Sequence, residues 1–504
     1  MITNMKKWCL FLIPLQLFCS SLTTLYSTLD PTSVAQHFAF YELHPNTPEG
    51  KTALQHAWDL LSGGCTDCEP EVLFPTVDAH PIIALVNRST NDAPVLEDDQ
   101  LRVIERLARH LPNRKLKGSK IWSWAELIAL PFEEVDVARA LLIADLESNQ
   151  QKIRSYEATL DLMALQILAR LKENATPFDK IRLINDYIFS ELQFRFPPHS
   201  LYAEDIDLYT LLPAVIESRK GVCLGVSILY LSLAQRLDLP LQAITPPGHI
   251  YVRYEPPEAL EVNIETTARG IDVPSEYYLS LETRKLQKRN LKEVVGLAFM
   301  NQAAVAWHRE DHQAAIGLYE KGLSFLPNDP LITTFLGFQY LFVGNEKKGK
   351  ELLESVRSVL PDHLVTVDPA AEDFLQGKTS AAAIQALFQE VDQTRESILK
   401  KQKQLQEFPE SRSVLYHLAI THLQLGREKE AIPILERYMQ LDATNPTVAY
   451  YLAALYTHRL HFAAAWKYLK IAESLTAARD HYPRALTDLR KELERSSPQP
   501  HGTL

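Results

Sequence analysis

The chain has 504 residues, of which 46% are hydrophobic and 23% charged, so it is long enough for several folded domains rather than one core. A net charge of −11 without a dense lysine or arginine tract argues against nucleic acid as the main partner. The sequence has only five cysteines and no glycine-rich phosphate loop, so we expect no disulfide framework, no metal site, and no nucleotide or other cofactor.

Residues 1–21 have the parts of an export signal. Lys6 and Lys7 supply the positive charge, an apolar run covers 8–18, and small residues at 19–21 offer a cleavage site. The apolar run is too short to form a stable membrane span. We expect export to the periplasm or to the outside of a bacterial cell. The alternative is a cytoplasmic protein in which this stretch is an amphipathic or core helix.

An N-terminal helical region is predicted over 22–129. Its helical pieces, at 34–41, 53–61 and 99–111, are separated by loops rich in Pro, Asp and Asn. No residue pattern in this region indicates a role.

Cys65 and Cys68 form a Cys-x-x-Cys pair within this region. A zinc site needs a second pair of ligands at suitable spacing, and none follows. A thioredoxin-type motif needs a preceding strand, and none is evident. A local disulfide and two free thiols both remain open.

An α+β domain is predicted over 130–290. Apolar residues recur at helical spacing over 156–172 and 178–194, and a short helix follows at 207–217. The pattern then changes to β-type segments separated by Pro and Gly, which predicts a small antiparallel sheet. These segments are QAIT, HIYVRY and LEVNIE.

The chemical clue lies in the tract SRKGVCLGVSILYLSLAQRLDLPLQAITPPGHIYVRY, residues 218–254. Cys223 opens an apolar helix, where the helix dipole favours a thiolate. His249 follows a Pro-Pro-Gly turn, and Glu265 lies on the next predicted strand, so both are placed to activate a cysteine nucleophile. The alternatives are a buried inert cysteine, a structural histidine and a solvated carboxylate.

Helical repeats follow. Residues 296–329 and 330–363 align at a spacing of 34, as do 412–445 and 446–479. Small residues recur at two slots, where they let paired helices approach closely. The first slot holds Ala303, Gly337, Ala419 and Ala453, and the second holds Ala315, Gly349, Ala431 and Ala465.

This pattern resembles the tetratricopeptide repeat (TPR). Between the repeat pairs, 364–411 holds an irregular insert and a degraded repeat, and 480–504 forms a C-terminal helix and tail. We expect the concave face of the array to bind a protein or peptide partner. The alternative is a solenoid that only packs on its own catalytic domain.

The tracts DVARALLIADLE, YEATLDLMA, IRLINDYIFSELQFRF and the cysteine tract occur in an order that resembles the SirB1 family of the transglutaminase-like superfamily. Members often carry such repeats after the core domain. The resemblance implies an α+β transglutaminase-like (papain-like) fold followed by an all-α repeat solenoid. It also implies a triad that maps onto Cys223, His249 and Glu265, with Asn263 as the alternative third member. Residues 205–212 depart from the Asn-Ser element usual before the core helix.

The resulting hypothesis is a cysteine-nucleophile enzyme that acts on amide bonds, as a peptidase, an amidase or an acyltransferase. Many SirB1-type proteins lack the cysteine that this chain keeps. The alternative is a catalytically silent interaction or scaffold protein, whose repeats work beside a relic transglutaminase-like domain. A domain that senses a peptide without cleaving it is a third possibility.

Overall fold

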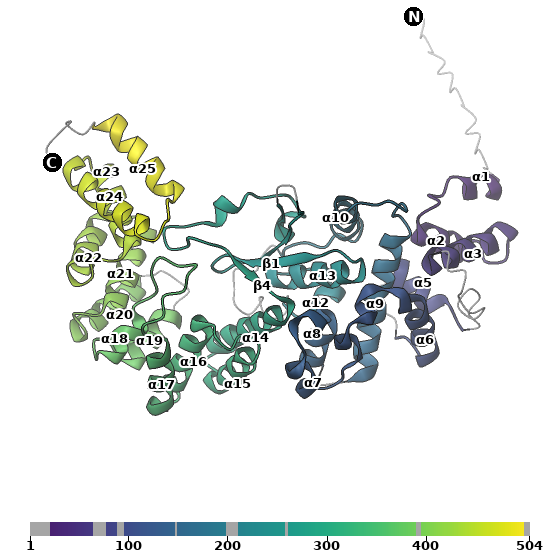
Figure 1. The fold of residues 1–504 in the computed structure, drawn as a ribbon, viewed down its shortest axis with the longest axis horizontal. Coiled ribbons are helices and arrows are strands. Elements are labelled where there is room, and N and C mark those ends of the chain that lie inside the picture. The colour runs from purple at the N-terminus through teal and green to yellow at the C-terminus, as the bar shows by residue number, and fades with distance from the viewer. Residues whose placement is uncertain are drawn as a thin grey trace, which may run out of the picture. The chain divides into compact units, whose positions relative to one another are not determined.

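The computed structural model of the protein describes residues 21–63, 77–87, 95–146, 149–197, 210–257, 261–389 and 395–497 (Figure 1). The predicted export signal up to residue 20, the pair Cys65 and Cys68, and most of 205–212 lie outside these ranges. The chain divides into two compact units, the first comprising residues up to Ala108 plus Asp161–Glu173, and the second the remainder. None of the described helices is long and apolar enough to cross a lipid bilayer.

The first unit is helical. Its helices are α1 (Leu22–Ser27), α2 (Val34–Leu43), α3 (Pro48–Ser62), α5 (His80–Asn87), α6 (Asp98–Leu107) and the C-terminal part of α9 (Gln150–Leu168). Helix α3 begins five residues before the predicted position of 53, because Thr47 caps the Gly50 amide and Pro48 takes the first helical position. Phe38 and Trp58 pack edge to face between α2 and α3.

The second unit begins with the helices of the α+β domain. They are α7 (Trp124–Ala129), α8 (Val137–Asp145), the first part of α9, α10 (Pro177–Asn185), the π-helical turn η5 (Asp186–Glu191), α12 (Leu212–Ser218) and α13 (Cys223–Arg236), with short 3-10 turns at η2 (Pro112–Lys115), η3 (Lys117–Lys120) and η4 (Phe132–Glu134). Buried Arg139 on α8 pairs with buried Glu157 on α9 at 2.6 Å. Burying either charge alone in this core would cost free energy, and the ion pair compensates for that cost.

A four-stranded antiparallel sheet covers α13. Its strands are β1 (Leu241–Thr245), β2 (Tyr251–Tyr254), β3 (Val262–Ile264) and β4 (Gln287–Arg289), in the order β3-β2-β1-β4. Val252 lies opposite both Ala243 and Ile264, and all three are fully buried. The first three strands match predicted segments. Strand β4 has no sequence signal, because its three polar residues show no alternation.

Pairs of antiparallel helices follow the sheet. They are α14 (Leu291–His308) with α15 (His312–Leu323), α16 (Pro330–Phe342) with α17 (Glu346–Val356), α21 (Arg412–Gln424) with α22 (Glu428–Leu441), and α23 (Pro446–His458) with α24 (Phe462–Ala477). The starts of α15 and α17 differ by 34 residues, as do those of α22 and α24. The predicted architecture, an α+β domain with a small antiparallel sheet followed by helical repeats, is confirmed.

The small residues of the repeats lie where the paired helices touch. All eight are buried. A Cβ atom on Gly349 would lie 2.5 Å from the Leu341 side chain, and one on Gly337 would lie 2.9 Å from that of Leu353. The small residues therefore recur in the sequence because larger side chains at these positions would prevent the close approach of the two helices.

Between the repeat pairs lie α18 (Ala370–Leu375), α19 (Ala381–Gln389) and α20 (Arg395–Glu407), and α25 (Arg484–Ser496) ends the described chain. Arg412 joins this insert to the second repeat pair. Its guanidinium contacts Asp373 at 2.8 Å, Glu372 at 2.7 Å and Asp442 at 3.0 Å. The insert predicted as irregular thus contains a short helix that is fixed by an ionic cluster.

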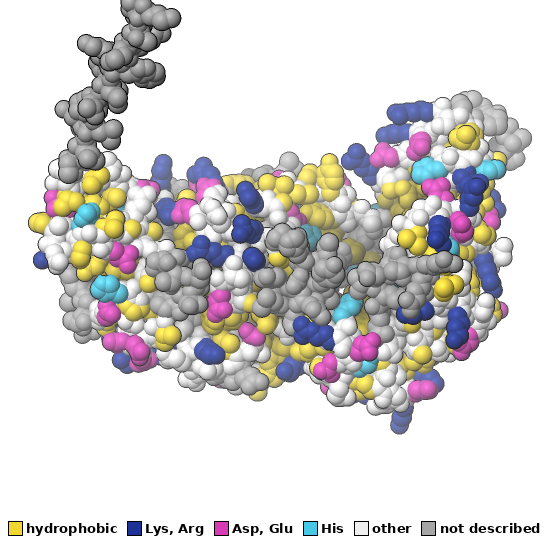
Figure 2. Space-filling view, turned by 180° about the vertical axis from the view of Figure 1, so that it is seen from behind, with side chains coloured by type: hydrophobic (Ala, Val, Ile, Leu, Met, Phe, Trp, Pro, Cys, Tyr) yellow, Lys and Arg dark blue, Asp and Glu magenta, His cyan; other side chains and the backbone are white. Residues whose placement is uncertain are grey.

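The surface carries both signs of charge. Figure 2 shows one face, on which Lys and Arg side chains lie among Asp and Glu side chains instead of forming a separate area. A mixed surface of this kind gives no electrostatic footprint for a nucleic acid on the part that is visible there.

We predict opposite effects of adding one methyl group at two glycines of neighbouring repeats. Gly349→Ala forces a Cβ against Leu341 and should lower the free energy of unfolding by about 1–3 kcal/mol. Gly317→Ala on α15 is the control, since a Cβ there meets nothing within 4 Å and should be neutral or stabilise by up to about 1 kcal/mol. Denaturant unfolding of both variants checks this; equal effects would contradict the close packing.

Candidate active site

Cys223 is the first residue of α13. The preceding residue, Val222, occupies the N-cap position and supplies no side-chain hydrogen bond to the helix end. The first amide N–H groups of an α-helix have no partner within the helix and carry a partial positive charge. The Cys223 side chain is half-buried, so its sulfur sits beside these donors with partial access to solvent.

A narrow turn leads into Cys223. The Gly221 amide donates to the Arg195 carbonyl at 3.2 Å, which ties the turn to the segment after η5. A Cβ on Gly221 would lie 2.5 Å from the Val226 side chain and 3.1 Å from its amide nitrogen. Glycine is therefore required for the chain to enter the helix at this angle.

His249 is placed by a second turn. Its amide donates to the Pro246 carbonyl at 3.1 Å, and Gly248 has a φ of 68°. Proline followed by a glycine at positive φ gives a type II turn. We predicted His249 at the start of a strand; it instead ends this turn, two residues before β2.

The structure brings the three predicted triad residues together. His249 Nε2 lies 2.7 Å from Glu265 Oε2. His249 also forms a side-chain hydrogen bond with Cys223. With Nε2 committed to the carboxylate, Nδ1 is the ring nitrogen left for the sulfur. This is the order of groups that a cysteine nucleophile with an oriented imidazole requires.

Glu265 lies just beyond β3, where it caps the 3-10 turn η6 (Thr266–Ala268) instead of continuing the strand. Its Oε1 accepts from the Thr267 amide at 3.0 Å, and Oε2 also accepts from the Tyr278 hydroxyl. Burial alone would raise the pKa of this carboxyl. The hydrogen bonds from His249, Thr267 and Tyr278 outweigh burial and lower the pKa to about 2. Glu265 is therefore ionised at neutral pH.

His249 shows the complementary shift. Burial alone would lower the pKa of its imidazole, but the hydrogen bonds to Cys223 and Glu265 and the carboxylate charge raise the pKa to about 9. The ring is thus protonated at neutral pH. Its Nε2–H donates to the Glu265 carboxylate, and a proton is available on the side of the sulfur.

Tyr278, on the 3-10 turn η7 (Ser275–Tyr278), completes the site and was not predicted. Besides its hydrogen bond to Glu265, its ring stacks on the His249 imidazole with centroids 5.7 Å apart and planes 20° apart. It also stacks on the Tyr251 ring at 4.8 Å. Nothing in the local sequence marks this tyrosine, because both contacts depend on the fold of the loop after β3.

Asn263, the alternative third member, has other partners. Its Oδ1 accepts from the Arg253 Nε at 2.8 Å, and its Nδ2 donates to the Val273 carbonyl at 2.7 Å. Strand pairing places Asn263 directly opposite Arg253, away from the turn that carries His249. The structure thus brings Glu265, and not Asn263, to the imidazole.

Asn185 supports the Glu265 turn from behind and was also not predicted. It accepts from the Tyr230 hydroxyl on α13 at 3.0 Å and donates to the Gly270 carbonyl at 3.3 Å. Gly270 has a φ of 75°, and its amide donates to the Glu265 carbonyl at 2.8 Å. Asn185 therefore contacts both α13, which begins at Cys223, and the turn that follows Glu265.

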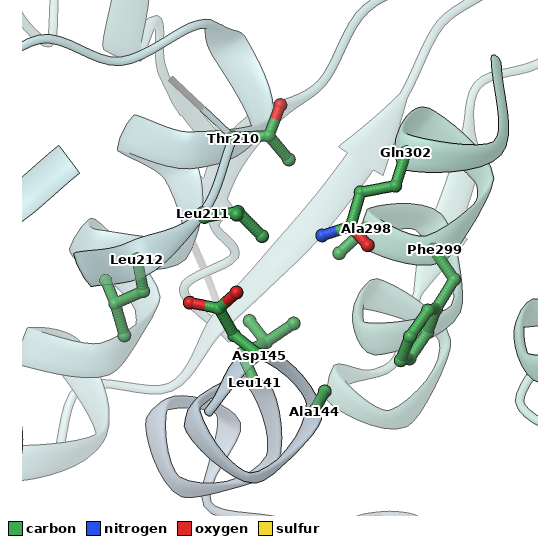
Figure 3. Close-up of a pocket in the computed structure, with 9 residues that line it drawn as sticks. All are labelled: Leu141, Ala144, Asp145, Thr210, Leu211, Leu212, Ala298, Phe299 and Gln302. Atoms are coloured by element: carbon green, nitrogen blue, oxygen red, sulfur yellow. The ribbon is translucent and has the colours of Figure 1, made fainter. Parts of the chain in front are cut away.

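A small recess of about 20 Å³ lies between α8, α12 and α14 (Figure 3). In the close-up, Asp145 and Gln302 face it from opposite sides, among apolar side chains such as Leu141 and Phe299. A volume of this size admits about one water molecule. Cys223, His249 and Glu265 do not line it.

Among the residues that the structure describes, no group of three or more His, Cys, Asp or Glu side chains is arranged to hold a metal ion.

Part of the chain is similar to a known protein family. Residues 154–294, which include the whole triad, match the family model described as the transglutaminase-like superfamily. A search of the curated proteins found no match.

Three solved structures are also similar in part. The MamA protein is 17% identical over 37% of this chain and 93% of its own, with a TM-score of 0.20. A thermophilic TPR protein of Thermus thermophilus is 18% identical over 40% of this chain and 98% of its own, with a TM-score of 0.17. The Cut9-Hcn1 structure of the APC/C is 14% identical over 94% of both chains, with a TM-score of 0.21. Scores this low add nothing to the repeat fold that the helix pairs show directly.

We predict that the ion pair stabilises the protein most strongly in a defined pH window. Because the pKa of His249 is raised to about 9, its contribution is complete below about pH 6.5 and is lost as pH rises through 9. Because the pKa of Glu265 is lowered to about 2, its contribution is complete above about pH 4.5 and is lost as pH falls toward 2. Glu265→Gln should therefore cost about 1–3 kcal/mol near pH 5.5 and less near pH 9.5.

Denaturant unfolding at the two pH values measures this difference. Glu276→Gln is the matched control, since Glu276 is exposed on the neighbouring turn. A loss for Glu265→Gln that does not change with pH would contradict the ion pair.

Proposed function

We propose that this protein is a cysteine acyl-transfer enzyme that acts on amide bonds. In this proposal Cys223 is the nucleophile, His249 carries the proton, and Glu265 holds the imidazole. The observation that carries the proposal is the continuous chain of hydrogen bonds from Cys223 through His249 to Glu265. A buried carboxylate with a lowered pKa that holds an imidazole beside a cysteine is typical of a functional site.

The first half of the reaction begins when the Cys223 thiolate attacks the amide carbon and forms a C–S bond. The developing oxyanion lies at the N-terminus of α13, where the Cys223 and Leu224 amides point and Val222 offers no competing cap. The C–N bond then breaks as the His249 imidazolium gives its proton to the leaving amine. A thioester on Cys223 and a neutral His249 result.

The second half uses neutral His249 as a base. It takes a proton from the acceptor while the acceptor attacks the thioester and expels the Cys223 thiolate. Water as acceptor gives a peptidase or an amidase, and an amine gives a cross-linking transferase. Glu265 stays ionised throughout and keeps the ring in one orientation.

We further propose that the domain is of the SirB1 type, with glutamate in the place where relatives carry an aspartate. The extra methylene is accommodated because Glu265 is fixed at its other oxygen by the Thr267 amide and hydroxyl, at 3.0 and 2.5 Å. The repeats would recruit a protein substrate or partner, as repeat arrays of this kind do.

We predict that Cys223 in the native protein reacts with iodoacetamide faster than a free thiol near neutral pH. His249→Ala should slow this reaction by about tenfold or more, because the neighbouring positive charge that stabilises the thiolate is lost. Mass spectrometry of the peptide that carries Cys223 separates its labelling from that of the other cysteines. His308→Ala, in the first repeat, is the control. If Cys223 reacts no faster than a free thiol and His249→Ala changes nothing, the chain is a silent interaction protein.

We also propose that the protein is exported, on the basis of the leader at 1–21. The intact mass of the mature protein from its native host should lack this segment. Retention of Lys6 and Lys7 in the mature protein would instead support the cytoplasmic alternative.

A further inference from the structure

Residues 277–285, which we call the strap, run directly from the active site to the repeat array. At the first end, Tyr278 donates to Glu265 and stacks on His249. The chain then leaves the sheet and reaches the repeats before it returns as β4 (Figure 1). The same short segment therefore contacts both parts of the second unit.

The far end of the strap is held by backbone pairing. Thr283 forms an antiparallel bridge with Leu364, in the loop between α17 and α18. The Val365 amide donates to the Glu282 carbonyl at 2.7 Å, and the Arg284 amide donates to the His363 carbonyl at 2.9 Å. These bonds form a two-stranded ribbon between the α+β domain and the insert of the array.

The end of the array clamps both sides of this ribbon. His481 Nε2 lies 2.6 Å from the Ser280 carbonyl, and Tyr277 hydrogen-bonds Arg484 of α25. Arg479 donates to the carbonyls of Pro361 and Leu364, at 3.2 and 2.9 Å. The strap and its partner loop are thus fixed by residues that follow the last repeat.

Side chains of the strap also enter the array. Leu281 packs against the hydrophobic cluster formed by α21–α25. Glu282 is half-buried near Tyr416 on α21 and Tyr451 on α23, and burial together with the charge of Asp368 raises its pKa. A carboxyl held in such surroundings shows that the contact is a formed interface and not a passing approach.

We propose that Tyr278 is a positioning residue for the triad and that the repeat array controls it through the strap. With the strap docked, Tyr278 donates a hydrogen bond to Glu265 and stacks its ring on the His249 imidazole. When the strap leaves the side of α21 and α23 that carries Tyr416 and Tyr451, Tyr278 is released and the alignment of Glu265 and His249 changes. This proposal rests on the proposed role of Cys223.

The test loosens the strap at its remote end and measures the site. His481→Ala removes the contact to Ser280, and His458→Ala is its matched control, an exposed histidine whose Nδ1 lies 3.6 Å from Glu428 Oε1. In hydrogen exchange, His481→Ala should speed exchange roughly tenfold in the strap and also at the Glu265–Ile271 turn, whereas His458→Ala should change neither. Leu281→Ala is a second variant with the same expectation, should His481→Ala impair folding.

The pH profile of Cys223 alkylation is then measured for the same variants. Tyr278→Phe and His481→Ala should shift the profile in the same direction, because the first removes the tyrosine donor to Glu265 and the second loosens the strap that holds it. Tyr482→Phe, an exposed tyrosine beside His481, should leave the profile unchanged.

The two measurements separate the two proposals. If wild-type Cys223 is not activated, the proposed function fails, and exchange alone decides whether the strap controls the Glu265 turn. Faster exchange in the strap with no change at that turn would overturn the control by the array, whether or not Cys223 is reactive. Unchanged exchange in the strap of both His481→Ala and Leu281→Ala would likewise overturn the control by the array, because the docking contacts would then not hold the strap.

Discussion

The site depends on one buried carboxylate whose charge must be satisfied. Glu265 is almost fully buried, and an ionised carboxylate in such a place is tolerated only with several donors. It has donors from three separate segments: His249 from the turn before β2, Thr267 from its own turn, and Tyr278 from the loop after β3. The need to satisfy this charge brings these segments together, and the imidazole is oriented as a consequence.

The position of Glu265 explains why a glutamate serves here. As the cap of a 3-10 turn it folds back on the Thr267 amide, which uses one oxygen and fixes the carboxylate plane. The other oxygen is then aimed at His249 Nε2. The longer side chain of glutamate still places its carboxylate precisely, because the hydrogen bond to the turn restricts its conformations.

The sequence predicted those parts whose signals are local. Proline and glycine encode the turn before His249, and the spacing of small residues encodes the helix pairs. Tyr278, Asn185 and β4 could not be predicted in this way, because each acts only through contacts between segments distant in sequence. The strand assigned to Glu265 was one residue too long for a similar reason, since the cap of η6 competes with the end of β3.

Two interpretations of the repeats, recruitment of a partner and packing on the catalytic domain, are compatible in this fold. The strap already occupies part of the array, where Leu281, the backbone bonds to residues 363–365 and the contacts of Ser280 and Tyr277 with His481 and Arg484 hold it. An intramolecular contact acts at an effective concentration on the order of millimolar, so a competing segment must bind more tightly than the strap to displace it. Burying Glu282 near Asp368 lowers the stability of the docked state. Undocking of the strap restores the solvation of this carboxyl, which offsets part of the free energy that undocking costs.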